Sequence, residues 1–217
     1  RIPMRPDADL SPPGFARLIA DFLEALDLRD VTLVANDTGG AMSQITAAHH
    51  PERIGRLVLT NCDAFENFLP PAFRPLQYAA RVPGMLTAIL QSMRLAPLRK
   101  TPLAYGWLIK KDIDDAPLRD WVEPYLSDAA IRRDAIKVLR GIHPRYTLEA
   151  AERLRSFDRP VLLAWAREDR FFKLSFAERL ADAIPGARLE PIDDSYTFVS
   201  EDQPERLAEL IREFAPA

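Results

Sequence analysis

The residue with the clearest chemical potential is Asp37, which lies in the stretch VTLVANDTGGAMSQ over residues 31–44. A short β-branched run precedes it, and small residues followed by an amphipathic segment come after it. A carboxylate presented at such a turn can act as a nucleophile toward an sp3 carbon. It can equally cap the helix that follows, since Asp-Thr-Gly-Gly is ordinary turn chemistry.

The residues around Asp37 favour the nucleophile. Ala35-Asn36-Asp37-Thr38-Gly39 has the pattern of a strand-to-helix turn with small residues two positions to either side of its apex. The N–H of Thr38 would then point at charge that develops beside the apex. A phosphate-binding loop fits poorly, because the glycine spacing is absent and a carboxylate would repel phosphate.

The elements that would position this turn are strands alternating with helices. Apolar runs predict strands over 31–35, 57–60, 159–166 and 187–192, and apolar positions at helical spacing predict helices over 12–26, 40–50, 176–184 and 204–214. Such alternation implies a parallel sheet covered by helices, hence the α/β class. Ligands of open α/β sheets bind at the carboxyl ends of the strands, where Asp37 would lie.

The middle of the chain differs from both flanks. Residues 64–156 are proline-rich, contain no strand-like run and include helical patterns such as 86–93 and 129–139. We therefore predict an α/β core over 1–63 and 157–217, interrupted by a helical cap over 64–156.

Composition excludes several partners. Hydrophobic residues make up 47% of the 217 positions and the formal charge is −3, with both signs interleaved, so no nucleic-acid or membrane-surface footprint is expected. The single cysteine, Cys62, cannot form an internal disulfide, and no apolar run reaches about 20 residues. No His or Cys cluster has the spacing of a metal site. We expect a cytoplasmic protein with a small-molecule substrate and no cofactor, and the oligomeric state stays open.

Four segments in order resemble the α/β-hydrolase fold, in particular the aspartate-nucleophile branch of epoxide hydrolases and haloalkane dehalogenases. They are LVANDTGGAMSQ, PERIGRLVLTNCDAF, RPVLLAWAREDRFF and IDDSYTFVSEDQPERLAELI. The middle helical block occupies the position of the family's cap. The resemblance implies that the first strands of the fold, with the second oxyanion donor, lie upstream of Arg1.

The resemblance also implies roles for particular residues. Asp37 matches the nucleophile, Thr38 the oxyanion donor and Asp169 the acid after the strand that follows the cap. Asp63 occupies an alternative acid position, which we rank behind Asp169. The sequence departs from the family at Thr197, which stands before Phe198 where the family has its histidine. A threonine hydroxyl cannot serve as a general base near pH 7.

No other histidine is an obvious substitute for that base. His49 and His50 are adjacent on a predicted helix, so their side chains diverge by about 100°. His143, in RGIHPRY near the end of the predicted cap, is the one that would have to overhang the cleft. Thr38 itself replaces the tryptophan that similar dehalogenases use for the halide.

These observations leave two functional interpretations. In the first, Asp37 attacks a small apolar substrate to form an alkyl ester, as in epoxide hydrolases and dehalogenases, with the second half-reaction lacking its usual base. In the second, the protein is a catalytically degenerate member that binds a small apolar ligand, with Tyr105, Trp107 and Trp121 as candidate lining residues. A nucleotide-binding doubly wound domain is a weaker third interpretation.

Overall fold

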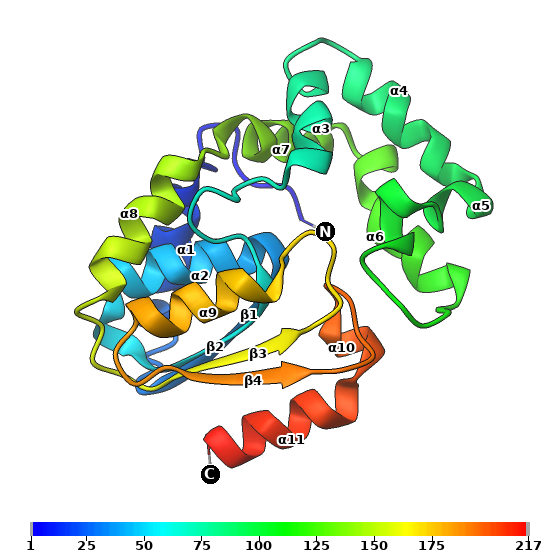
Figure 1. Ribbon diagram of the computed structural model, residues 1–217. Helices are drawn as coiled ribbons and strands as arrows, with labels where there is room; N and C mark the ends of the chain where they lie inside the picture. Colours follow the sequence, from blue (N-terminus) through cyan, green and yellow to red (C-terminus); the bar gives the residue numbers. More distant parts are fainter. Residues whose placement is uncertain (1, 216–217) are drawn as a thin grey trace.

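The sheet contains four parallel strands in the order β1-β2-β3-β4 in the computed structural model, which describes residues 2–215 (Figure 1). The strands span Val31–Asn36 (β1), Ile54–Cys62 (β2), Val161–Ala166 (β3) and Arg188–Ile192 (β4). All four predicted strands are therefore confirmed. β2 is longer than predicted at both ends: Ile54 and Arg56 already pair with Val31 and Thr32 of β1, and the strand continues to the buried residues Asn61 and Cys62.

The two faces of the sheet pack against different helices, because successive side chains of a strand point to opposite sides. In β3, Val161, Leu163 and Trp165 belong to the larger core, which the helices on one face complete. Leu162, Ala164 and Ala166 face the other way and share a second core with helix α11. The unbroken apolar run of β3 is thus explained by burial on both faces.

Helices cover both faces of this sheet (Figure 1). On one face lie α1 (Pro12–Ala25), α2 (Asp37–His49), α8 (Pro144–Leu154) and α9 (Leu174–Ala183), and on the other lies α11 (Pro204–Phe214), preceded by the short α10 (Val199–Asp202). α1 begins as predicted, with the Ser11 hydroxyl accepting from the N–H of Gly14 at 3.3 Å. α2 begins at Asp37 instead of Gly40, because the turn residue itself enters the helix.

The segment between β2 and α8 is helical and includes α3 (Arg74–Ala79), α4 (Met85–Gln91), α5 (Ala96–Arg99), α6 (Asp115–Ser127) and α7 (Ala129–Gly141). Single turns occupy Pro51–Arg53, Pro71–Phe73 and Ser92–Arg94, with a five-residue π turn at Pro102–Gly106. α4, α5 and α6 stand away from the sheet (Figure 1). They share a small apolar core with α3 and α7 that includes Leu86, Val122 and Tyr125. α8, by contrast, packs on α2 and α9.

Within residues 2–215, none of the helices has the length and apolar character needed to cross a bilayer.

Candidate active site

Asp37 occupies a sharp turn at the carboxyl end of β1. Its backbone has φ +53°, in the left-handed region, and it is the first residue of α2. A non-glycine residue in that region costs roughly 1–2 kcal/mol, so the surrounding structure must hold it there. The residue is half-buried, and it bridges to Cys62 at the end of the neighbouring strand β2. The turn therefore presents a carboxylate at the edge of the sheet where ligands of α/β proteins bind.

Gly39 and Gly40, the glycines that follow Asp37, differ in whether the structure has room for a side chain at their position. A Cβ placed on Gly39 would have no atom within 4 Å, whereas one on Gly40 would lie 2.3 Å from the Cβ of Cys62. The sequence pattern predicts that position 39 requires a small residue. In the structure, position 40 has this requirement instead, because Gly40 is the residue that faces β2.

Asp63 lies directly after β2 and is fully buried. Its Oδ2 accepts a hydrogen bond from the Thr38 hydroxyl at 3.2 Å, while its Oδ1 has no hydrogen-bond partner among the described residues. The backbone carbonyl of Asp63 accepts from the side-chain amide of Gln44 at 2.8 Å. Thr38, the residue after Asp37, thus links the turn to Asp63.

Asp169 follows β3 and is held by its own loop. Its Oδ1 accepts from the N–H groups of Phe171 and Phe172 at 2.7 and 3.0 Å. Asn61, at the end of β2, anchors the same loop by donating to the carbonyls of Ala166 and Phe172. Asp169 is 6% exposed, and its Oδ2 has no hydrogen-bond partner in the described part of the chain.

Thr197 is fully buried, and its backbone carbonyl accepts from the side-chain amide of Asn36 at 2.8 Å. Asn36 precedes Asp37, so this bond ties the last loop of the fold directly to the turn. The Thr197 hydroxyl lies close enough to Asp169 to lower the pKa of that carboxyl. Neither this hydroxyl nor Oδ2 of Asp169 has a partner with hydrogen-bond geometry within residues 2–215.

The three carboxyl groups influence one another. Burial is the main cause that raises the pKa of Asp37 to about 6, and the charge of Asp169 adds to it, while the N–H of Thr38 lowers it. Burial likewise raises the pKa of Asp169 to about 6 against the lowering by its two backbone amides. Burial and the charge of Asp37 raise the pKa of Asp63 well above its ordinary value. Such displaced values in one cluster are typical of functional sites.

Three polar residues that the sequence analysis did not single out support this cluster: Asn36, Asn61 and Gln44. Asn36 does not cap α2; its amide donates to the Thr60 hydroxyl at 2.8 Å and to the Asn61 carbonyl at 3.0 Å, besides Thr197. All three are polar residues at the end of an apolar strand or inside an apolar helix. That position is the signal that could have identified them.

A fourth such residue, Asp202, is fully buried near the same loop. Its carboxylate accepts from the backbone N–H groups of Lys110 and Lys111 at 2.8–3.0 Å and from that of Tyr196 at 2.9 Å. The Ser195 hydroxyl donates to it at 3.4 Å. Asp202 therefore joins the loop that carries Thr197 to the segment after the π turn.

The histidines have other surroundings. His49 lies at the far end of α2, about 18 Å along the helix from Asp37, and its Nε2 is 3.6 Å from a carboxylate oxygen of Glu149. His50 follows it, with the two ring centroids 6.5 Å apart and the rings tilted by 45°. His143 is exposed, and its Nδ1 caps α8 by accepting from the N–H of Arg145 at 3.1 Å. A helix-capping role thus accounts for the position of His143.

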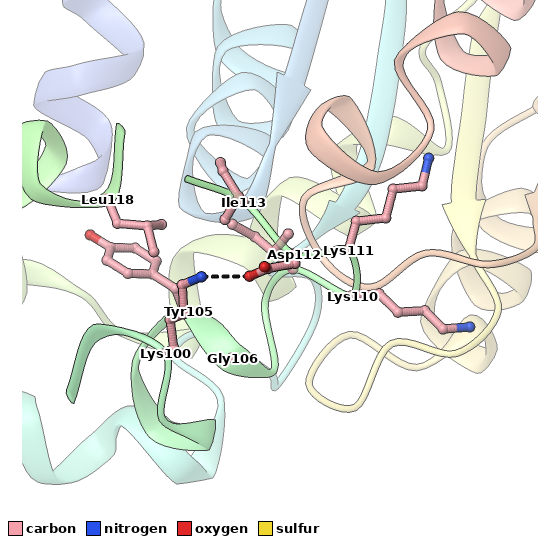
Figure 2. Close-up of a pocket in the computed structure, with 9 residues that line it drawn as sticks. Lys100, Tyr105, Gly106, Lys110, Lys111, Asp112, Ile113 and Leu118 are labelled. Carbon is pink, nitrogen blue, oxygen red and sulfur yellow. Dashed lines mark hydrogen bonds and ion pairs between the residues drawn. The ribbon is translucent and has the colours of Figure 1, made fainter. Parts of the chain in front are cut away.

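The three aromatic residues proposed for one ligand pocket are divided among different surroundings. Tyr105 lines a pocket of about 220 Å³ with Leu118 and Lys100, and Figure 2 shows Lys100 paired with Asp112 beside it. Trp121 packs edge-on against the rings of Tyr105 and Phe198, at 5.3 and 5.8 Å between centroids.

Trp107 lines a larger pocket of about 580 Å³, which we call the Trp107 pocket. Its walls come from residues 66–72, from Trp107 itself and from the loop after Asp169, including Arg170, Phe171 and Phe176. The Arg170 guanidinium lies over the Trp107 ring at 4.8 Å. Of the pockets described here, this one is next to the loop that carries Asp169.

Comparison of the sequence with known proteins identifies relatives along most of the chain. The family described as alpha/beta hydrolase fold matches residues 5–204. The uncharacterized hydrolase YugF of Bacillus subtilis is 25% identical over 201 residues, which cover 93% of this chain and 71% of that protein. A cis-3-alkyl-4-alkyloxetan-2-one decarboxylase of Xanthomonas campestris is 28% identical over 193 residues, 85% of this chain and 62% of that protein.

Comparison of the structure gives the same fold. The haloalkane dehalogenase DatA of Agrobacterium tumefaciens superimposes with a TM-score of 0.75 at 22% sequence identity. The match covers 97% of this chain and 74% of DatA.

Proposed function

The chain belongs to the α/β-hydrolase fold family, and from this premise we propose that it is a hydrolase whose nucleophile is Asp37. Its substrate is a small, largely apolar molecule with an electrophilic sp3 carbon, such as an epoxide or an alkyl halide. Asp169 is the acid of the site and Thr38 supplies an oxyanion donor. The residue at the position of the family's histidine is Thr197.

The observation that carries the proposal is the conformation of Asp37. A left-handed φ at the first residue of a helix holds the carboxylate at the end of β1, whereas an ordinary helix cap would not need this strain. With a pKa of about 6, this carboxylate is mostly ionised at pH 7. Its half-buried position leaves it poorly hydrated, which favours attack on carbon.

The first half-reaction follows from this arrangement. A carboxylate oxygen of Asp37 forms a bond to the electrophilic carbon. The electron pair of the breaking bond goes to the halide, which departs, or to the epoxide oxygen, which stays on the product and takes a proton from solvent. The product is an alkyl ester on Asp37. The Thr38 N–H, which lies against this carboxyl, would stabilise an oxyanion when the ester carbonyl is later attacked.

The family likeness to a haloalkane dehalogenase supports the substrate class, and the position of the Trp107 pocket supports a route to it. Phe171 and Phe176 give this pocket an apolar wall beside the Asp169 loop. A substrate that entered here would pass from an aromatic surface toward the carboxyl cluster.

Thr197 favours a second candidate, a protein that binds such a molecule without turning it over. With a threonine where the family has its base, the ester or the unreacted ligand would stay in the site. The two candidates differ in one observable, the release of product.

The test is product formation from a panel that includes styrene oxide and 1-bromobutane, measured as diol and as bromide. The wild-type protein is compared with Asp37→Asn and with Asp158→Asn, which changes an exposed carboxylate elsewhere. We expect product from the wild type and from Asp158→Asn, and at least about a thousand-fold less from Asp37→Asn. Equal product from Asp37→Asn would refute the assignment of the nucleophile.

A further inference from the structure

Four buried polar side-chain atoms have no hydrogen-bond partner within residues 2–215, and two of them belong to the elements that carry the acid and the residue at the family's histidine position: Oδ2 of Asp169 and the hydroxyl of Thr197. Leaving a buried polar atom unpaired costs about 1–3 kcal/mol. Buried water commonly removes this cost by bonding to two or more such atoms. A threonine side chain is also smaller than the imidazole that the family has at this position.

The surroundings of these two atoms are fixed. The backbone amides of Phe171 and Phe172 hold Oδ1 of Asp169, which leaves Oδ2 as the free oxygen of that carboxyl. The Asn36 amide holds the Thr197 carbonyl at 2.8 Å, and Asn36 is bonded directly to Asp37 in the chain. The two atoms therefore belong to elements that are tied to the nucleophile.

We propose that Asp169 itself is the general base of the second half-reaction, acting on a water molecule held between its Oδ2 and the Thr197 hydroxyl. This inference rests on the proposed function, since it concerns the ester formed on Asp37. It changes the role of Asp169 from orienting a histidine to accepting a proton directly.

The step balances without another reactant. The water oxygen forms a bond to Cγ of the Asp37 ester while one water proton passes to Oδ2 of Asp169. The tetrahedral intermediate then breaks its bond to the alkyl oxygen, and the departing alkoxide takes the proton from Asp169. The products are an alcohol, the carboxylate of Asp169 and the carboxylic acid of Asp37, which holds the second water proton and one oxygen derived from water. Loss of that proton to solvent regenerates the carboxylate of Asp37.

Asp63 is less suited to this role. Its Oδ1 is free within residues 2–215, as Oδ2 of Asp169 is, but burial raises the pKa of Asp63 well above its ordinary value, which favours the protonated form that cannot accept a proton. The thiol of Cys62, the other titratable group in contact with the cluster, has a pKa that burial raises well above its ordinary value. Asp169, with a pKa of about 6, is mostly ionised at neutral pH and can accept a proton.

The test follows the ester on Asp37 after a single exposure to styrene oxide. Intact-protein mass spectrometry gives its rate of decay, and turnover in H₂¹⁸O reports label in Asp37. The variants are Asp169→Asn, Thr197→Val and the exposed control Asp158→Asn. Asn at position 169 can still accept from both loop amides through Oδ1, so we expect it to fold.

We expect the ester to form in all of them. Its decay should be at least about a hundred-fold slower in Asp169→Asn and about ten-fold slower in Thr197→Val, and unchanged in Asp158→Asn. In the wild type, the decay rate should rise with pH up to about 6 and then level, with ¹⁸O in Asp37.

Several outcomes would overturn the proposal. An ester that decays equally fast in Asp169→Asn removes Asp169 as the base and leaves the proposed function intact. An ester that forms but persists in the wild type also removes Asp169 as the base; it keeps Asp37 as the nucleophile and favours the second candidate, a protein without turnover. If Asp169→Asn does not fold, the pH dependence of ester decay in the wild type tests the proposal instead. A decay rate that does not change with pH would also remove Asp169 as the base. A wild-type protein that forms no ester with any electrophile of the panel refutes the proposed function itself.

Discussion

Two sets of buried aspartates lie near the loop that carries Thr197, and they differ in how their oxygens are bonded. Asp202 accepts four hydrogen bonds, three of them from backbone N–H groups. Asp63 and Asp169 each keep one oxygen without a partner among the described residues. Both environments are buried, so burial alone does not distinguish them.

This difference in bonding distinguishes a carboxylate with a structural role from carboxylates that keep an oxygen available for chemistry. A buried carboxylate whose acceptors are all used stabilises the segments that donate to it, as Asp202 does for the loop before Thr197 and for Lys110 and Lys111. A buried carboxylate with a free oxygen costs stability and keeps an acceptor for substrate or water. The molecule thus places its unsatisfied carboxyls beside the strained turn at Asp37.

The largest expected effect comes from restoring the family's base. Thr197→His should raise the decay rate of the Asp37 ester about 10²–10⁴-fold, since an imidazole oriented by Asp169 is a better base for water near pH 7. Thr197→Asn, which adds bulk without a base, is the matched control. Mass spectrometry of the styrene oxide adduct measures the decay, and equal rates in the two variants would contradict the prediction.

Removing the satisfied carboxylate should mainly affect stability. Asp202→Ala leaves several buried donors unpaired, so we expect the free energy of unfolding to fall by about 3–5 kcal/mol. Asp169→Asn should not lower it at pH 7, because the loop amides keep an acceptor and the side chain carries no buried charge. Urea unfolding measures both. A larger loss for Asp169→Asn than for Asp202→Ala would reverse the comparison.

The unsatisfied carboxyls should also leave a signature in the pH dependence of stability. The pKa values of Asp37 and Asp169 are about 6 in the folded protein, against an ordinary value of 3.8. The folded protein therefore binds these protons more tightly than the unfolded chain does. The corresponding stability is fully present below pH 3.8 and is lost as the pH rises through about 6, at roughly 3 kcal/mol per group.

Urea unfolding between pH 4 and 7 tests this sign. As the pH rises over this interval, the free energy of unfolding of the wild type should fall relative to that of Asp37→Asn. It should not fall relative to that of Asp158→Asn. A wild type that gains stability over Asp37→Asn as the pH rises would show that the carboxylate of Asp37 is stabilised in its charged form.

The smallest effect concerns the glycines of the turn. Gly40→Ala should destabilise by about 1–3 kcal/mol, because the new Cβ would overlap with Cys62. Gly39→Ala, which meets no atom within 4 Å, should change stability by less than about 1 kcal/mol. Thermal unfolding distinguishes them. Equal costs would mean that the close approach of α2 to β2 is not set at Gly40.

The sequence predicted the architecture well because β2 and β3 are buried on both faces and the helices on one. The run Arg159–Ala166 and the face of Pro204–Phe214 each give an unambiguous pattern, and the structure has a strand and a helix there. α2 begins at Asp37, three residues before the predicted start at Gly40, because Asp37 combines a helical position with a left-handed φ. Local patterns do not report such strain.

The carboxyl positions at strand ends were also accessible from the sequence, because each follows an apolar run. The bonds that hold them were not. Asn36 reaches Thr197 across 161 positions, and Asp202 reaches Lys110 across 92. No pattern within a window of the sequence contains both partners, so these supporting residues became visible only in the fold.

The measurement that tests the central claim most directly is the site of alkylation. The protein is exposed to styrene oxide at pH 7.5, which is chosen to lie above the Asp37 pKa of about 6 so that this carboxylate is ionised. Tandem mass spectrometry of the peptides then locates the adduct. We predict a single ester on Asp37 that is absent from Asp37→Asn. Alkylation spread over exposed carboxylates, or an equal yield in Asp37→Asn, would contradict the account.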